Sequence, residues 1–419
     1  MAAAAAIAGT TQCVPPANAV APPPIDSSRL PAAAPAAPAR PTVQRDACAV
    51  PTLDPAASGT QLEGLDLPAV WALTRGAGQR VAVIDTGVAP HRRLPGLVGG
   101  GDYVFTGNGT QDCDGHGTLV AGIIGAAPDP ADRFSGVAPL ATVIGIRQSS
   151  TRFGTIGDGP GVGDVDTLAK AVRIAADLGA AVINISAVAC RPEGSGLDDR
   201  ALGAALAYAV EAKNAVVVSA AGNTDDGCDA EQPMIVSPAW YDDYVLTVGS
   251  VDAHGAPSAF TRAGPWVDVA APGEAVLSLS TVGDAMATNA GGTSFAAPVV
   301  SGLAALIRAR FPDWTPRQVM DRIKATARHP PGGRDDVVGA GVIDPLAAVS
   351  FEAAPTVWRV PEPARPAPSA PPIVESVTAP AGLRTAITGT GGLLALLLAV
   401  LTGRALAARH RAPAAPARD

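Results

Sequence analysis

Five short apolar runs recur along this 419-residue chain, and they constrain its fold more than any other feature. The runs are residues 81–84, 141–146, 181–185, 215–218 and 245–248. A short apolar run is typical of a parallel strand that is buried on both faces of a sheet. Helical patterns lie between some of these runs, at residues 166–178 and 201–212, and another opens the domain at 68–73. This alternation predicts an α/β fold, with a doubly wound, mostly parallel sheet and helices on both faces.

Three polar segments stand out against this background. They are Val-Ile-Asp85-Thr-Gly, Asp-Gly-His116-Gly-Thr and Gly-Gly-Thr-Ser294-Phe-Ala-Ala-Pro, and the three central residues are 31 and 178 positions apart. A serine hydroxyl becomes a nucleophile when an imidazole takes its proton and a carboxylate holds that imidazole in the right tautomer. Asp85 directly follows an apolar run, and parallel sheets carry their sites at the carboxyl ends of strands. We therefore predict a catalytic triad of Asp85, His116 and Ser294.

His116 and Ser294 each precede an expected apolar helix, at residues 119–126 and 295–308. The free N–H groups and positive dipole end of the second helix would lie near Ser294, where they suit an anionic intermediate. Pro298 falls in the first turn of that expected helix, where N–H groups have no intrahelical partner and a proline is tolerated. The glycines on either side of His116 are expected to leave room for substrate and nucleophile.

The order of the three segments resembles that of the subtilisin-like serine proteases, and the resemblance covers about residues 60–350. It implies that Asn223, in Ala-Ala-Gly-Asn, donates from its side chain to an oxyanion hole, together with the backbone N–H of Ser294. It also implies that Ser186, Ala187 and Val188 form an edge for an extended substrate. Relatives often have Leu-Gly-Gly after the matching serine. The bulkier residues here are expected to narrow the pocket and to favour a small side chain before the cut.

Four cysteines besides Cys13 allow three pairings, and their spacing alone does not choose among them. Cys190 and Cys228 both follow apolar runs that should be neighbouring strands, and Cys113 lies three residues before His116. These positions predict the bridges Cys190–Cys228, at the cleft, and Cys48–Cys113, which would tie the N-terminal residues beside His116. A location outside the cytoplasmic membrane, which the C-terminal segment predicts below, favours disulfides. The alternative is free buried thiols.

No metal and no cofactor is expected. Two acidic clusters lack the alternating oxygen ligands of an EF-hand loop and are interpreted as solvated loops; they are Asp225, Asp226 and Asp229, and Asp164 and Asp166. The remaining histidines, His91, His254 and His329, are expected at the surface. The formal net charge of -8 and the lack of a basic run in the body of the sequence argue against nucleic-acid binding.

Composition divides the chain into six parts. Residues 1–25 match a secretory signal poorly and are expected to be an atypical signal or a disordered tail. Residues 26–63 form a Pro/Ala-rich N-terminal extension, residues 64–350 the peptidase domain, and residues 351–384 a proline-rich, extended linker.

A membrane anchor is predicted near the C-terminus. Residues 385–403 carry no charge, and a helix of that length rises about 28 Å, close to the ~30 Å hydrocarbon thickness of a bilayer. Several arginines follow, so residues 404–419 are expected to form a cytoplasmic tail, with the folded domain outside the cytoplasmic membrane.

Further segments narrow the resemblance. They are Asp112-Cys-Asp-Gly-His116-Gly-Thr, Ile146-Arg-Gln-Ser-Ser150, Ala239-Trp-Tyr-Asp-Asp243 and Gly264-Pro-Trp-Val-Asp-Val-Ala-Ala-Pro-Gly273. With the four cysteines, the linker and the C-terminal span, the chain resembles the mycosins, membrane-anchored subtilisin-like proteases of type VII secretion systems. The resemblance implies association with the secretion membrane complex, limited cleavage of secreted, extended polypeptides, an extension wrapping the domain, and little need for calcium.

Two alternatives stay open at this point. In the first, the domain mainly stabilises the secretion complex, and proteolysis is secondary. In the second, the chain is a general degradative protease of the cell surface that has no connection with secretion.

Overall fold

The computed structural model describes residues 21–350, apart from 54–59, 160, 226 and 230. Among these residues, no helix is both long and apolar enough to cross a membrane. The predicted linker at 351–384, transmembrane helix at 385–403 and tail at 404–419 lie outside the described residues, as does most of the segment 1–25. Those parts, and the boundaries between the six parts, stay predictions.

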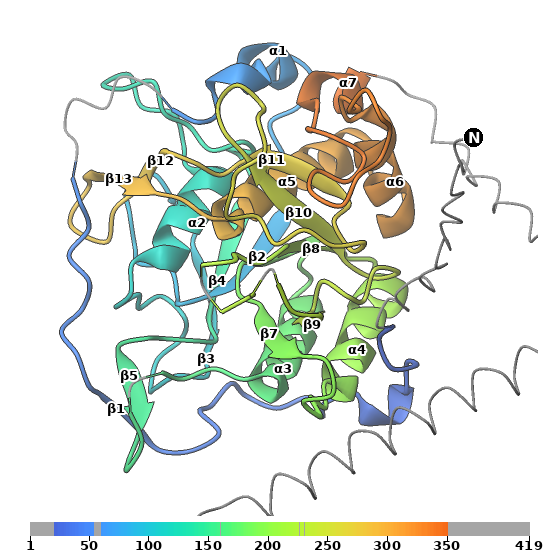
Figure 1. Cartoon of the computed structure of the whole chain (residues 1–419). Coiled ribbons are helices and arrows are strands. Elements are labelled where there is room, and N and C mark those ends of the chain that lie inside the picture. The colour runs from blue at the N-terminus through green and yellow to red at the C-terminus, as the bar shows by residue number, and fades with distance from the viewer. Residues whose placement is uncertain (1–20, 54–59, 160, 226, 230, 351–419) are drawn as a thin grey trace, which may run out of the picture. The chain divides into compact units, whose positions relative to one another are not determined.

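The central sheet has seven strands in the order β11-β10-β8-β6-β2-β4-β3 (Figure 1). Every neighbouring pair in this sheet is parallel. The strands are β2 (Arg80–Asp85), β3 (Val98–Asp102), β4 (Thr142–Arg147), β6 (Val182–Ile185), β8 (Val216–Ala220), β10 (Leu246–Val251) and β11 (Val269–Pro272). The five apolar runs form the five inner strands, so the prediction of a buried parallel sheet is confirmed.

The two edge strands were not predicted. β3 reads Val98-Gly-Gly-Gly-Asp102, and this glycine run hides the strand because it lacks apolar side chains. A methyl group on Gly100 would lie 2.6 Å from the side chain of Ile146 and 2.7 Å from that of Ile144. Glycine therefore lets β3 lie close against the large side chains of β4.

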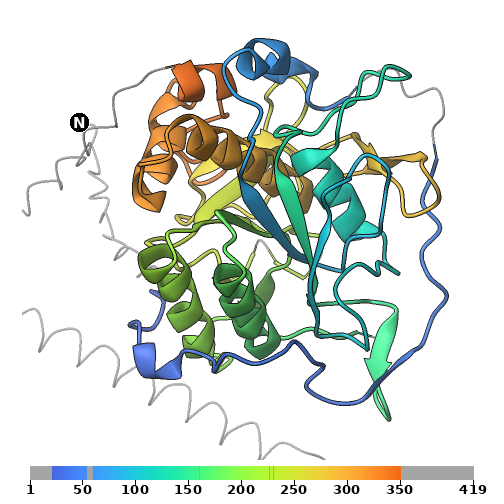
Figure 2. The ribbon, with the colours of Figure 1, turned by 180° about the vertical axis from the view of Figure 1, so that it is seen from behind.

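Helices cover both faces of the sheet (Figures 1 and 2). They are α1 (Leu67–Trp71), α2 (His116–Gly125), α3 (Val165–Asp177), α4 (Arg200–Ala207), α5 (Thr293–Arg310), α6 (Pro316–Thr326) and α7 (Pro345–Ser350). Alternate residues of β2 point to opposite faces. Val81 and Val83 join the core shared with α2 and α5, whereas Ala82 and Ile84 join the core shared with α3 and α4. The doubly wound arrangement is thus confirmed.

Two predicted helix starts are wrong, and both errors fall at the site. α2 begins at His116 itself rather than after it, and α5 begins at Thr293 rather than at Phe295. Pro298 is consequently the sixth residue of α5 and lies beyond its first turn, so the expected reason for its tolerance does not hold. The sequence also placed a single helix at 201–212, whereas α4 ends at Ala207 and a π-helical turn, Tyr208–Ala212, follows it.

The described part of the N-terminal extension has little regular structure. It holds one 3-10 turn, Ser27–Arg29, and the short strand β1 (Thr42–Gln44), which pairs antiparallel with β5 (Phe153–Thr155). Another 3-10 turn, Glu63–Leu65, precedes α1. The outer loops carry two antiparallel pairs, β7 (Ala189–Pro192) with β9 (Met234–Ser237) and β12 (Val276–Leu279) with β13 (Met286–Ala290). Leu53 of the extension forms a single antiparallel bridge to Ala287 of β13.

Candidate active site

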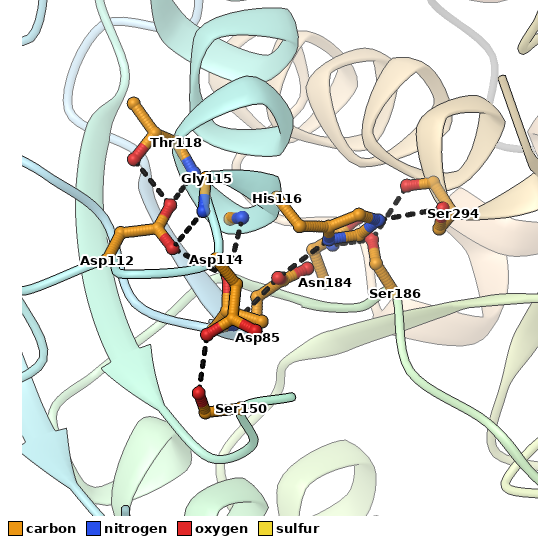
Figure 3. A network of polar contacts seen from close by, with 12 residues as sticks. Asp85, Asp112, Asp114, Gly115, His116, Thr118, Ser150, Asn184, Ser186 and Ser294 are labelled. Carbon is orange, nitrogen blue, oxygen red and sulfur yellow. Dashed lines mark hydrogen bonds and ion pairs between the residues drawn. The ribbon is translucent and has the colours of Figure 1, made fainter. Parts of the chain in front are cut away.

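The fold brings the three predicted triad residues together at the carboxyl edge of the sheet (Figure 3). Asp85 ends β2, His116 begins α2, and Ser294 is the second residue of α5. His116 Nδ1 lies 2.7 Å from Asp85 Oδ1, and His116 Nε2 lies 2.9 Å from Ser294 Oγ. With Nδ1–H donating to the carboxylate, Nε2 is free to accept the serine proton, which is the geometry that nucleophilic catalysis needs.

Burial and charge act in opposite directions on His116. Burial by itself lowers the pKa of this imidazole, but the nearby carboxylates of Asp85, Asp112 and Asp114 outweigh burial, so the pKa is raised above its usual value. The ring of Phe295 packs against the imidazole, with 4.8 Å between ring centroids. About a third of the His116 side chain, 31%, stays exposed, so a substrate can reach it.

A second carboxylate, that of the half-buried Asp112, ties the loop before α2 to the end of β2, and sequence reasoning missed this role. Its Oδ1 accepts from the Thr86 hydroxyl (2.8 Å) and the Gly115 N–H (2.7 Å). Its Oδ2 accepts from the N–H (2.8 Å) and the hydroxyl (2.6 Å) of Thr118. Burial raises the pKa of Asp112 to about 6. The only sequence signal was its place in the segment that contains His116.

The glycines beside His116 both have a reason in the backbone. A methyl group on Gly117 would lie 2.0 Å from the carbonyl oxygen of Gly87 and 3.1 Å from the Asp85 side chain. Gly115 has a φ of 84°, in the left-handed region that glycine adopts most readily. For Gly117 the structure thus gives a backbone reason in place of the expected room for substrate, whereas for Gly115 that room stays a prediction.

Asn223 lies in the loop after β8, beside Ser294. Its Oδ1 accepts from the N–H (3.0 Å) and the hydroxyl (2.9 Å) of Thr293, so the amide oxygen is engaged and Nδ2 remains as a donor. A methyl group on Gly292 would lie 3.1 Å from Ser294 Oγ and 3.2 Å from Asn223 Nδ2, so these two atoms border one space. Thr293 thus orients Asn223, a contact that the Gly-Gly-Thr-Ser segment did not reveal.

The predicted substrate edge follows β6. Ser186 is buried, and its hydroxyl donates to the backbone carbonyl of Ser294 at 2.8 Å. Ala187 and Val188 line a cavity of about 380 Å³, together with Gln148 and Leu168. Within this edge, Ser186 therefore contacts the residue that carries the nucleophile, whereas Ala187 and Val188 form part of the cavity wall.

Both predicted disulfides are present. Cys48 bridges to Cys113, and Cys190 bridges to Cys228. Strands β6 and β8, which precede the second pair, are neighbours as the sequence indicated. Cys13 lies outside the described residues.

Asp164 is exposed, as expected of a solvated acidic residue, although it has an added structural role, whereas His91 differs from expectation. Asp164 caps α3, where its side chain accepts from the Thr167 N–H at 2.7 Å. His91 is buried, at 6% exposure, and its Nδ1 accepts from the Arg93 N–H. Within the described residues, no cluster of three or more His, Cys, Asp or Glu side chains could hold a metal ion.

Comparison with known proteins agrees with this geometry. The sequence pattern of the subtilase family matches residues 76–341. Mycosin-4 of Mycobacterium tuberculosis is 58% identical over 426 residues, which cover 95% of this chain and 93% of that protein.

Solved structures give the same result. The crystal structure of MycP1 from Mycobacterium smegmatis is 44% identical, with a TM-score of 0.74 over 80% of this chain and 96% of that one. A chain of an intact ESX-5 inner membrane complex is 39% identical, with a TM-score of 0.74 over 92% of this chain and 100% of that one. The chain therefore belongs to the mycosins, subtilisin-like serine proteases within the subtilase family.

Proposed function

We propose that this chain is a serine endopeptidase whose triad is Asp85, His116 and Ser294. The observation that carries the proposal is the continuous hydrogen-bonded array from carboxylate to imidazole to hydroxyl, at 2.7 and 2.9 Å. Ser294 Oγ attacks the peptide carbonyl carbon while its proton moves to His116 Nε2. The C–N bond then breaks, and His116 returns the proton to the leaving amine. Water, activated by the same imidazole, hydrolyses the acyl-enzyme and restores the serine.

The negative oxygen of the tetrahedral intermediate is stabilised by Asn223 Nδ2 and the Ser294 N–H. Two features support this role. Thr293 occupies the amide oxygen of Asn223, so the amide presents donors to the space beside Ser294. The Ser294 N–H belongs to the first turn of α5, where N–H groups lack intrahelical acceptors and the helix dipole is positive.

Extended polypeptides are the proposed substrates, bound along the edge of Ser186, Ala187 and Val188 as an added strand. The side chain before the cut is proposed to be small. Crowding near Gly222 supports this, because a methyl group there would lie 2.8 Å from Cys228 Sγ and 3.5 Å from Val188 Cγ2.

We further propose a single-pass membrane protein, anchored by residues 385–403, whose protease domain acts outside the cytoplasmic membrane on secreted substrates of type VII secretion. The similarity to a chain of the ESX-5 inner membrane complex supports association with such a complex, because the alignment spans 92% of this chain. No cofactor and no nucleic acid enters the proposed function.

The same similarity favours a second candidate, in which the domain mainly stabilises the secretion complex. The Ser294→Ala variant separates the two roles. If secretion survives while processing of substrates stops, the stabilising role stands apart from the chemistry.

A serine-reactive phosphonate tests the enzymatic proposal directly. The purified full-length chain is expected to be labelled, and Ser294→Ala is expected to abolish labelling. Ser250→Ala, a buried serine on β10, serves as a matched control and should be labelled like the unchanged protein. A folded protein that is not labelled and cleaves no peptide would contradict the proposal.

A further inference from the structure

The first turns of α5 contain a backbone carbonyl whose ordinary helical donor is missing. In an α-helix, the carbonyl of residue i accepts from the N–H of residue i+4. The residue four positions after Ser294 is Pro298, which lies inside α5 and has no N–H. The nucleophile therefore sits on a peptide unit whose carbonyl lacks its ordinary helical donor. A buried carbonyl of this kind needs a donor from elsewhere.

Ser186 provides that donor. Its hydroxyl donates to the Ser294 carbonyl oxygen at 2.8 Å, and the contact joins the end of β6 to the start of α5 (Figure 3). The two residues are 108 positions apart in sequence, so only the fold brings them together. Ser186 is only 7% exposed, so water has little access to compete for the hydrogen bond.

The Ser186 hydroxyl is itself held by a relay that returns to the same helix. Asn184 Nδ2 donates to Ser186 Oγ at 2.8 Å, and Asn184 Oδ1 accepts from the Ser301 hydroxyl at 2.8 Å. Asn184 and Ser301 are both fully buried. Since a carbonyl can only accept, the direction of each hydrogen bond in the relay is fixed. The relay therefore contacts α5 at Ser294 and at Ser301, which are seven residues apart.

We propose that Ser186 is a positioning residue for Ser294: it replaces the hydrogen bond that Pro298 removes and so fixes the peptide unit that carries the nucleophile. The inference deepens the proposed function and rests on it. The Ser294 side chain and N–H, which serve as nucleophile and oxyanion donor, share one Cα with this carbonyl. A shift of the peptide unit would therefore disturb both groups at once, and catalysis is sensitive to small displacements.

Four variants test the role of Ser186. They are Ser186→Ala, Pro298→Ala, the double variant with both changes, and Ser250→Ala as a control for the loss of a buried serine hydrogen bond, because Ser250 Oγ lies 2.9 Å from Ser258 Oγ. Two rates are measured: phosphonate labelling, and cleavage of a peptide p-nitroanilide with alanine before the bond. The melting temperature reports the fold.

Ser186→Ala is expected to lower kcat and the labelling rate about tenfold while KM changes less than about twofold. Pro298→Ala restores an N–H four residues after Ser294, so the double variant is expected to recover to within about threefold of Pro298→Ala alone. Such rescue would not occur if Ser186 only stabilised the fold. Ser250→Ala should match the stability loss of Ser186→Ala without the loss in kcat.

Two results would overturn the inference. One is a kcat for Ser186→Ala within about twofold of the unchanged protein, and the other is a double variant that is as slow as Ser186→Ala. If Ser186→Ala does not fold, Ser186→Cys keeps nearly the same size with a weak donor, and an unchanged kcat there would equally contradict it. An unchanged, folded protein that is not labelled and cleaves no peptide refutes the proposed function instead, so the two failures are distinguishable.

Discussion

The two disulfides are predicted to stabilise the fold almost equally, although they tie very different parts of the chain. The perturbation is the paired replacement Cys48→Ala/Cys113→Ala, compared with Cys190→Ala/Cys228→Ala. A cross-link removes loop entropy from the unfolded chain in proportion to the logarithm of the loop length. The separations are 65 and 38 residues, which correspond to about 4.3 and about 3.9 kcal/mol.

The expected loss for either pair is therefore about 4 kcal/mol of unfolding free energy, with a difference of only about 0.5 kcal/mol. Urea unfolding of the purified protein, followed by tryptophan fluorescence, measures both losses. The first pair should keep kcat within about twofold, because Asp112 holds the loop before His116 through Thr86 and Thr118 without help from the bridge.

Two outcomes would refute this reasoning. A loss below about 1 kcal/mol for Cys48→Ala/Cys113→Ala would mean that this disulfide hardly constrains the unfolded chain. A loss for one pair that exceeds the other by more than about 2 kcal/mol would mean that native packing around the sulfur atoms, rather than loop length, sets the effect.

Three further predictions concern catalysis. Asp112→Asn removes a negative charge near His116 and should lower the pKa of that imidazole. Because His116 must be neutral to take the serine proton, the acidic limb of the kcat/KM profile should move to lower pH. An acidic limb that does not move would contradict the electrostatic coupling. Asn223→Ala should lower kcat about 10²–10³-fold with little change in KM, which is the range known for the equivalent donor in subtilisin. Steady-state kinetics of peptide cleavage measures both constants, and a smaller loss in kcat would contradict the oxyanion role of Asn223. Val188→Gly should raise kcat/KM for peptides with a larger side chain before the cut, and a series of peptides that differ only there would expose an unchanged preference.

Much of the fold could be predicted because its inner strands are buried on both faces. A strand such as β2, which has a core on either side, needs an apolar residue at nearly every position, and that requirement is visible in sequence. The edge strand β3 does not follow this pattern. Its glycines leave space for the large side chains of β4, and a run of glycines resembles a loop in sequence.

The triad could likewise be predicted, but the residues that hold it could not. Thr293, Asp112 and Ser186 act through hydrogen bonds to backbone groups or to other side chains, and such bonds depend on distances that only the folded chain defines. The start of α5 was placed two residues late for a similar reason. Glycine, threonine and serine at 292–294 resemble a loop, whereas the structure uses them as the cap and first residues of a buried helix.

The start of α2 presents an electrostatic conflict that explains why so many carboxylates gather there. A helix N-terminus carries positive partial charge, which disfavours the imidazolium that His116 must become during catalysis. The same feature helps at α5, where the developing charge on the substrate is negative. Asp112 resolves the conflict at α2, because it accepts the N–H groups of Gly115 and Thr118 and so covers the positive end of that helix. Asp85 then stabilises the imidazolium directly, and the raised pKa of His116 is the net result of these opposing effects.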